Sequence, residues 1–180
     1  MVSYFSSDWH LGHDKEFIWK ERGFASLADH NTAVLAAVDA IRPGDELFFL
    51  GDMAMTSGKR EIIADVFARC KGTIVFCKGN HDPTMDHLLD LAKRAGENKV
   101  TIALTYSLER AHYLLGHYPP RDAEGESHNA HAFDAPEYIE GARILHGHTH
   151  SKSRVSPLGA INVAWDAWGR FPSLEDLKAL

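Results

Sequence analysis

The residues best suited to chemistry in this chain lie in Gly79-Asn80-His81-Asp82, directly after the strand-like residues 73–77. An Asn and a His at the carboxyl end of a strand place an amide oxygen and an imidazole at the edge of a sheet, where α/β proteins hold their functional groups. Four similar segments also follow short apolar runs: Asp8-Trp9-His10, Gly51-Asp52, Gly116-His117 and Gly147-His148-Thr149-His150. Asp, Asn and His at five strand ends, usually beside a glycine, form the pattern that a site for two divalent metal ions requires.

The hydrophobic pattern predicts the elements that must position these residues. Strands are expected at residues 2–6, 46–50, 73–77, 100–105, 112–115, 142–145 and 161–164. Helices are expected at residues 26–41, 59–70, 85–95 and 173–180, with a short turn at 14–19. The first half alternates strand and helix, whereas residues 100–115 resemble an antiparallel hairpin and residues 121–134 a long polar loop. This order predicts a layered α/β protein.

Length and composition favour one domain over residues 1–180, since 180 residues with 44% hydrophobic content suit a single sizeable core. No signal peptide and no apolar run long enough to cross a bilayer is found, so we expect a cytoplasmic protein without a membrane partner. The two cysteines, Cys70 and Cys77, are expected to be buried thiols. A net charge of −6 argues against stable binding to nucleic acid, which depends on clustered Lys and Arg.

The order of the five motifs resembles that of the calcineurin-like metallophosphoesterase superfamily, and in particular its small single-domain prokaryotic and phage phosphoesterases. The resemblance extends from the first strand to the last. It implies a four-layer α/β/β/α sandwich, in which two mixed sheets pack face to face between helices. It also implies a hydrolase that acts on phosphate esters through a hydroxide bridging two metal ions.

Carried over by position, the resemblance assigns seven ligands. One ion would be held by Asp8, His10 and His150, the other by Asn80, His117 and His148, with Asp52 bridging both. Because alternate residues of an extended chain point the same way, Asp8 and His10 can face one ion while His148 and His150 divide between two. Carboxylate, amide and imidazole ligands suit Mn²⁺, our first expectation, and also Fe, Zn²⁺, Ni²⁺ or Co²⁺.

The charges of such a centre indicate its substrate. Two divalent ions with the carboxylates Asp8 and Asp52 leave a surplus of about +2, which attracts a phosphate anion. His81 follows a ligand without being one, so it is expected to protonate the leaving oxygen or bind the phosphate. His81 and Asp52 are therefore the expected catalytic residues.

The sequence departs from the protein phosphatases of this superfamily at the loop after Asp52. Those enzymes carry an Asp and an Arg shortly after the bridging Asp, whereas here the residues are Met53-Ala54-Met55-Thr56. The motifs look more like the phosphodiesterase branch, whose usual substrates are small nucleotides. We therefore expect a small phosphate ester as the partner, such as a phosphodiester, a 2′,3′-cyclic nucleotide or a small phosphomonoester.

Two other function classes are compatible with the motifs. A metal-dependent nuclease would usually bring extra domains and a basic surface, and this chain has neither. A non-catalytic scaffold of the same fold, like the retromer subunit that resembles it, would be expected to have lost ligands, but none of the seven is missing. The sequence favours the enzyme.

Other histidines have open roles. His13 either lines the pocket or caps the following turn, and His146 is expected to pack behind the ligands rather than bind metal. His30 is expected to be a surface or strand-face residue without chemistry. His128 and His131 lie in the long polar loop and either face substrate or solvent. Trp165 is expected in the core, with an aromatic shelf for a nucleobase as the alternative.

Overall fold

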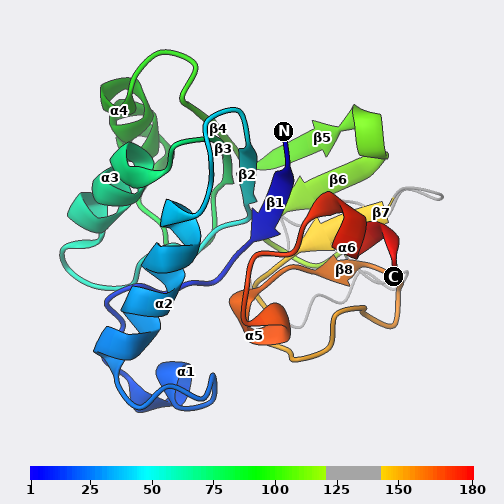
Figure 1. Cartoon of the computed structure of the whole chain (residues 1–180), viewed down its shortest axis with the longest axis horizontal. Helices are drawn as coiled ribbons and strands as arrows, with labels where there is room; N and C mark the ends of the chain where they lie inside the picture. Colours follow the sequence, from blue (N-terminus) through cyan, green and yellow to red (C-terminus); the bar gives the residue numbers. More distant parts are fainter. Residues whose placement is uncertain (121–142) are drawn as a thin grey trace.

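Two four-stranded sheets, flanked by helices, form the framework of the computed structural model, which describes residues 1–120 and 143–180 (Figure 1). The first sheet has the order β1 (Ser3–Ser6), β2 (Glu46–Phe49), β3 (Thr73–Cys77), β4 (Val100–Ala103). All its neighbouring strands are parallel. Their carboxyl ends therefore lie at one edge of the sheet, which is where β1, β2 and β3 deliver three of the sequence motifs.

The second sheet has the order β5 (Thr105–Leu108), β6 (Tyr113–Gly116), β7 (Arg143–His146), β8 (Ile161–Asn162). Strand β5 is antiparallel to β6, and the other two pairs are parallel. Only this sheet is mixed, so the expectation of two mixed sheets is wrong for the first. The first sheet is parallel because a helix connects each of its consecutive strands.

The chain passes from one sheet to the other at Leu104, which is 50% exposed. Ala103 pairs with Cys77 in the first sheet, whereas Thr105 pairs with Gly116 in the second. The hairpin predicted from residues 100–115 is therefore partly wrong: its first arm is β5, connected to β6 by the 3-10 helix η1 (Glu109–Ala111). Two short strands in succession have the same apolar pattern as one longer strand, which explains the error.

The predicted helices are confirmed with small changes at their ends. They are α1 (Glu16–Trp19), α2 (Leu27–Asp39), α3 (Lys59–Arg69), α4 (Met85–Ala95) and α6 (Leu174–Lys178), together with an unpredicted α5 (Trp165–Trp168). Helix α2 begins where predicted because the Ser26 hydroxyl accepts a hydrogen bond from the Asp29 N–H at 3.1 Å. Among the residues described, no helix is both long and apolar enough to cross a membrane.

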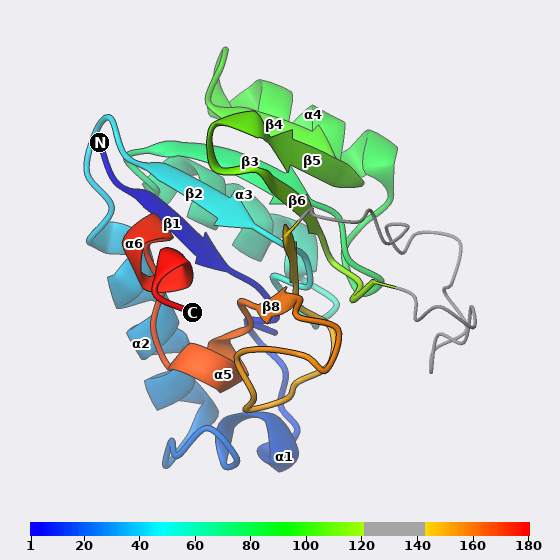
Figure 2. The same ribbon diagram turned by 90° about the vertical axis from the view of Figure 1, so that its right-hand side faces the viewer.

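Helices α2, α3 and α4 cover the outer face of the first sheet (Figures 1 and 2). Val34 and Val38 of α2 and Phe67 of α3 are fully buried in the core between these helices and the sheet. A second core lies between the two sheets, where Phe48 and Leu145 are buried. Helix α6 lies along β1, since Ser173 bridges to Tyr4 and Leu177 reaches the core between the sheets.

The two cysteines are free thiols in different cores, as predicted. Cys70 packs in the core under the helices and Cys77 in the core between the sheets. Burial raises the pKa of the Cys77 thiol to about 12. These thiols are therefore part of the packing.

We predict that Phe76→Ala lowers the free energy of unfolding by about 3–5 kcal/mol, because it opens a cavity in a packed aromatic cluster. The Phe76 ring is fully buried, with its centroid 5.2 Å from that of Phe49 and 5.8 Å from that of Phe67. Urea unfolding followed by tryptophan fluorescence measures the change. Phe17→Ala is the matched control, since Phe17 is 64% exposed and its loss should change stability by less than about 0.5 kcal/mol. Equal losses for both variants would contradict this account of the core.

Candidate metal centre

Five loops at the carboxyl ends of β1, β2, β3, β6 and β7 bring the seven predicted ligands together. The loops are fastened to one another through their backbones: Asp8 N–H donates to the Gly51 carbonyl at 2.9 Å, and Gly147 N–H to the His117 carbonyl at 3.0 Å. The first pair joins the loops after β1 and β2, and the second joins the loops after β6 and β7. Each ligand is thus held by neighbouring strand ends.

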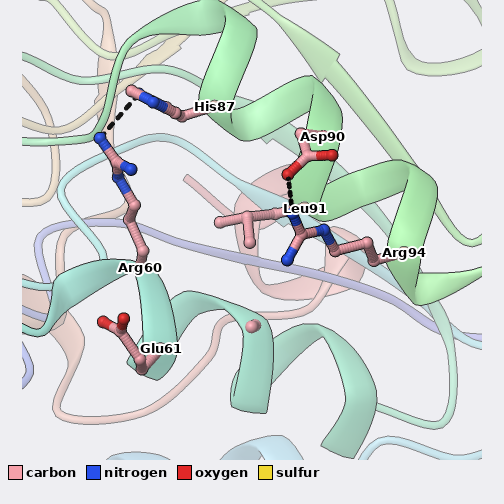
Figure 3. Close-up of a pocket in the computed structure, with 7 residues that line it drawn as sticks. Arg60, Glu61, His87, Asp90, Leu91 and Arg94 are labelled. Atoms are coloured by element: carbon pink, nitrogen blue, oxygen red, sulfur yellow. Dashed lines mark hydrogen bonds and ion pairs between the residues drawn. The ribbon is translucent and has the colours of Figure 1, made fainter.

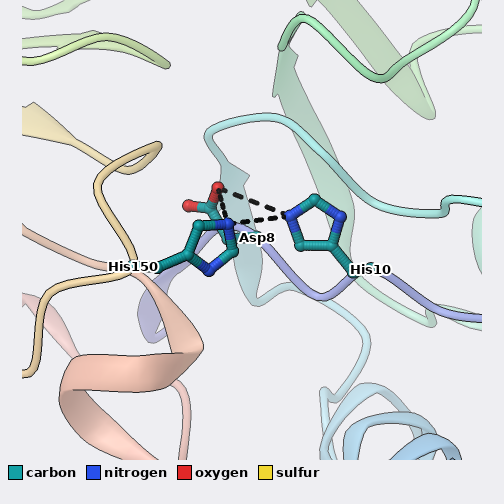
Figure 4. A group of neighbouring side chains, drawn as sticks. All are labelled: Asp8, His10 and His150. Atoms are coloured by element: carbon teal, nitrogen blue, oxygen red, sulfur yellow. Dashed lines mark hydrogen bonds and ion pairs between the residues drawn. The ribbon is translucent and has the colours of Figure 1, made fainter. Parts of the chain in front are cut away.

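The first group of ligands contains Asp8, His10 and His150 (Figure 4). The Nε2 atoms of His10 and His150 face each other at 3.1 Å, and each lies 3.9 Å from Oδ1 of Asp8. This Oδ1 is buried and has no hydrogen-bond partner among residues 1–120 and 143–180. A buried acceptor beside two imidazole nitrogens is unfavourable unless a cation compensates it, so the donor set fits a metal ion.

The second group contains Asn80, His117 and His148. His117 Nε2 lies 2.9 Å from Asn80 Oδ1 and 3.2 Å from His148 Nδ1, and these last two atoms are 3.1 Å apart. The other nitrogen of His117, Nδ1, donates to the Leu50 carbonyl at 2.7 Å. This bond leaves a lone pair on Nε2 directed at the amide oxygen, and a cation would relieve that contact between two acceptors.

Asp52 connects the two groups. Its Oδ2 lies 3.8 Å from His10 Nε2 in the first group and 3.5 Å from His117 Nε2 in the second. Ligand atoms of Asp8, Asp52 and His117 also lie within 4.8 Å of one another. Asp52 therefore has the position of a bridging carboxylate.

Burial gives the centre unusual electrostatics. Desolvation, together with the Asp8 and Asp82 carboxylates, raises the pKa of Asp52 to about 8. Desolvation also lowers the pKa of His10 to about 3, which leaves its ring neutral and able to bind metal. Two acidic side chains packed together without a nearby cation are costly, so the site is suited to positive ions.

The ligand loops have strained backbones. Asp8, His10, Asp52, His148 and His150 all have φ between 50° and 67°, in the left-handed region. The extended chain expected around Asp8-Trp9-His10 is therefore not present, although both side chains still reach one group. Strain of this kind is concentrated at functional sites, where surrounding structure maintains it.

Two motif glycines permit the close packing of these loops. A Cβ on Gly79 would lie 2.2 Å from Oδ1 of Asp52, and one on Gly147 would lie 2.2 Å from Oδ2 of Asp8. Real Cβ atoms do not approach other atoms so closely. The glycines beside the ligands therefore serve close approach to the two acids.

His81 lies beside the centre without belonging to either group. Its backbone N–H donates to Asp52 Oδ1 at 2.9 Å, and its Nε2 is 4.0 Å from Asp52 Oδ2. The side chain is 40% exposed, so it can meet a molecule arriving from solvent. Burial and the neighbouring His117 and Lys59 lower its pKa.

Asp82 is a structural acid whose role the sequence did not indicate beyond its place in the Asn80-His81-Asp82 motif. Its carboxylate is buried and accepts hydrogen bonds from the backbone N–H groups of Asp52, Met53 and Gly79 at 2.8, 3.0 and 2.8 Å. These bonds join the loops after β2 and β3. Asp82 thereby fixes the bridging Asp52 relative to Asn80.

The predictions for the remaining histidines are partly confirmed and partly wrong. The His13 ring contacts Phe17 and lies 5.8 Å from the His10 ring. No side-chain hydrogen bond caps α1, so a capping role is wrong, whereas a position in the pocket stays a prediction. His146 is buried and its Nδ1 contacts the Gly147 carbonyl at 2.9 Å, outside both ligand groups. His30 is fully buried in helix α2, so both its expected surface position and its expected strand-face position are wrong. His128 and His131 lie outside the described residues.

Met53, directly after Asp52, is fully buried in the core under the helices. Trp165 is buried against Phe171, with ring centroids 5.8 Å apart, so it belongs to the core. It does not offer a shelf for a nucleobase.

A groove between α3 and α4 is separate from the ligands (Figure 3). Four of its polar side chains contact one another in pairs: Arg60 contacts His87 at 3.0 Å, and Arg94 contacts Asp90 at 2.6 Å. None of the seven candidate ligands lines it. We assign it no part in the candidate centre.

Comparisons with known proteins give a fold but no function. No family model matches the chain. An uncharacterized protein of Methanocaldococcus jannaschii is 30% identical over 80 residues, 44% of this chain and 46% of that protein, so the match spans about half of that relative. The gene 66 protein of Mycobacterium phage L5 is 29% identical over an alignment of 196 residues that covers 99% of this chain and 93% of the phage protein.

One solved structure is similar over almost the whole chain. It is a protein of unknown function from Aquifex aeolicus, with a TM-score of 0.67 and 16% identity, and the match covers 99% of this chain and 98% of that one. At this level of identity the likeness concerns the fold alone.

We predict that Asp82→Asn lowers the free energy of unfolding by about 1–3 kcal/mol, because an amide nitrogen facing backbone N–H groups leaves buried donors without an acceptor. Asp14→Asn is the control, since the Asp14 side chain is 80% exposed and should be neutral within about 0.5 kcal/mol. Urea unfolding of the metal-free proteins provides the comparison. An unchanged midpoint for Asp82→Asn would show that the three bonds do not stabilise these loops.

Proposed function

We propose that this chain is a dinuclear metal-dependent phosphoesterase of the calcineurin-like type, with the four-layer α/β/β/α sandwich of that superfamily. The observation that carries the proposal is the position of Asp52, whose Oδ2 lies within 3.8 Å of His10 Nε2 and 3.5 Å of His117 Nε2. One carboxylate between two groups of nitrogen and oxygen donors is the arrangement that a metal pair requires. The convergence of all seven ligands also supports an enzyme over a scaffold.

The donor chemistry of each group fits a divalent transition-metal ion. Asp8, His10 and His150 would hold one ion, and Asn80, His117 and His148 the other, with Asp52 shared. Mn²⁺ is our first choice, and Fe, Zn²⁺, Ni²⁺ and Co²⁺ suit the same atoms. When bound, the ions supply Lewis acidity toward a phosphate and lower the pKa of water.

The chain's own residues have distinct roles in this proposal. Asp8 and Asp52 neutralise part of the metal charge and leave a local surplus of about +2, which attracts an anion to an otherwise acidic protein. His81 stands beside this charge with a partly exposed ring. In the proposed reaction it donates a proton to the leaving oxygen or binds a phosphate oxygen.

The surroundings of the centre favour a phosphodiester. The loop after Asp52 continues with the buried, apolar Met53 and Ala54, where protein phosphatases have charged residues. The guanidinium of Arg22, which lies behind the first ligand group, donates to Asp8, Trp9 and Asp166 and so is not available to a phosphate. In the described part of the site, a dianion would thus lack both the loop Arg of the phosphatases and the engaged Arg22, which suits a diester with its single negative charge. Small nucleotides, including 2′,3′-cyclic ones, are therefore the proposed substrates.

The protein loaded with Mn²⁺ should hydrolyse a model diester or a cyclic nucleotide faster than a phosphomonoester. The assay compares a phosphomonoester, a model diester, and 2′,3′- and 3′,5′-cyclic nucleotides. Asp52→Asn should lower turnover by about 100-fold or more, because even residues that only support ligands cost 10- to 100-fold. Asp39→Asn, on the exposed Arg69 ion pair, is the control and should retain activity. Cleavage of DNA alone would favour a nuclease, and no turnover on any substrate would favour a scaffold.

His81→Ala should keep both metal ions but lower turnover by about 10² to 10⁴-fold, since His81 is none of the seven proposed ligands and its proposed role is proton transfer or phosphate binding. Metal content and turnover are measured on the same preparation. The substrate must have a poor leaving group, so that protonation of the leaving oxygen limits the rate. Wild-type turnover with that substrate would remove His81 from the reaction.

A further inference from the structure

Arg22 lies in the connection between α1 and α2, behind the first ligand group, and its side chain is only 2% exposed. Two of its contacts form a bidentate pair with Asp166 of α5: Nε to Oδ1 at 3.0 Å and Nη2 to Oδ2 at 2.7 Å. Nη2 also donates to the Asp8 carbonyl at 2.6 Å, and Nη1 to the Trp9 carbonyl at 3.0 Å. The fifth contact is from Nη1 to His30 Nε2 at 2.9 Å. All five guanidinium N–H groups thus have partners.

Asp166 connects this guanidinium to a metal ligand. Its Oδ2, which accepts from Arg22, also lies 3.1 Å from Nδ1 of His150. A proton on Nδ1 shared with the carboxylate leaves the lone pair of His150 on Nε2, the atom that faces His10 and Asp8. Carboxylates that hold a histidine in this way fix its tautomer and orientation and raise its basicity.

We propose that Arg22 and Asp166 are positioning residues for the ion held by Asp8, His10 and His150, and that they set its affinity separately from that of the second ion. The proposal rests on the proposed function, since it requires a metal pair. Arg22 holds the backbone of Asp8, and Asp166 holds the ring of His150. Two of the three ligands are therefore oriented by one buried ion pair.

The second ligand group is oriented mainly by other contacts. His117 is oriented by the backbone carbonyl of Leu50, and the loop that carries Asn80 is held by the Asp82 carboxylate. A contact links the two halves, since the His148 N–H donates to Asp8 Oδ2 at 2.9 Å. The rings of His117 and His150 nevertheless have different partners, a backbone carbonyl and the Asp166 carboxylate. Loss of the ion pair should therefore lower the affinity for the ion at Asp8, His10 and His150 and leave the affinity for the second ion unchanged.

Asp166 lies outside both groups of candidate ligands and faces Arg22 and His150 instead. Both of its oxygens accept from Arg22, and one of them also faces His150. Lysine in place of Arg22 would keep the charge but could not make the planar fork. The geometry therefore requires both members of the pair.

The test is a Mn²⁺ titration of the full chain by calorimetry, with metal content checked by mass spectrometry. Wild-type protein should bind two ions. Asp166→Asn should bind one ion with unchanged affinity and the other about 10- to 100-fold more weakly, as expected for loss of a residue that orients a ligand. Its titration should resemble that of His150→Ala more than that of His148→Ala.

Asp39→Asn is the matched control, because it breaks another bidentate Arg–Asp pair, with Arg69, that touches no ligand. Both of its affinities should equal those of the wild type. If Asp166→Asn bound both ions more weakly to the same degree, the substitution would have loosened the whole site, and the proposal would be overturned. Two affinities equal to those of the wild type would also overturn it. Wild-type protein that binds fewer than two ions would instead overturn the metal pair itself.

A measurement on unaltered protein keeps the proposal testable if Asp166→Asn does not fold. In the protein loaded with Zn²⁺, nitrogen NMR of the histidine rings should show His150 protonated at Nδ1. Protonation at Nε2 would exclude the hydrogen bond to Asp166 and would overturn the proposal.

Discussion

The burial of two acids at one point, Asp8 and Asp52, is the constraint on which the structure depends. Both side chains are almost inaccessible to water, and this burial, together with the Asp8 and Asp82 carboxylates, raises the pKa of Asp52 to about 8. Such an arrangement is costly for a protein without a compensating charge. Other features at this edge of the sheets accompany this burial, including the neutral His10, the close approach of the motif glycines and the three backbone N–H groups, one of them that of Asp52, that donate to Asp82.

Much of the candidate centre could be predicted from the sequence because it depends on topology. Parallel strands place their carboxyl ends at one edge of the sheet. Asp8, Asp52 and Asn80 must therefore lie close together if the strands before them pair as expected. The helix at residues 85–95 and the strand at residues 73–77 were predictable to the residue, since each has a clear period and a distinct end. Ligand grouping followed from the family resemblance, and the distances around Asp52 agree with it.

Other features depend on tertiary contacts that leave no local pattern. The left-handed backbone conformation at His10 and His150 could not be predicted, because neither position is a glycine or an asparagine. The sequence around Leu104, where the chain passes between the sheets, has the pattern of one continuous strand. Arg22 and Asp166 are separated by 144 residues, and neither belongs to a motif. In the sequence, the turn that contains Arg22 resembles an ordinary solvated connection. Only the structure shows that the N–H groups of the Arg22 guanidinium all have partners.

The ligands come from both sheets, and this has a consequence for the order of folding. Strands β1, β2 and β3 supply Asp8, His10, Asp52 and Asn80, whereas His117, His148 and His150 follow β6 and β7. His10 and His150 are 140 residues apart in the chain, so a nascent polypeptide acquires the last of these ligands only after β7 has been synthesised. A chain that contains only the first sheet therefore holds an incomplete set of donors, and the assembled centre requires both sheets.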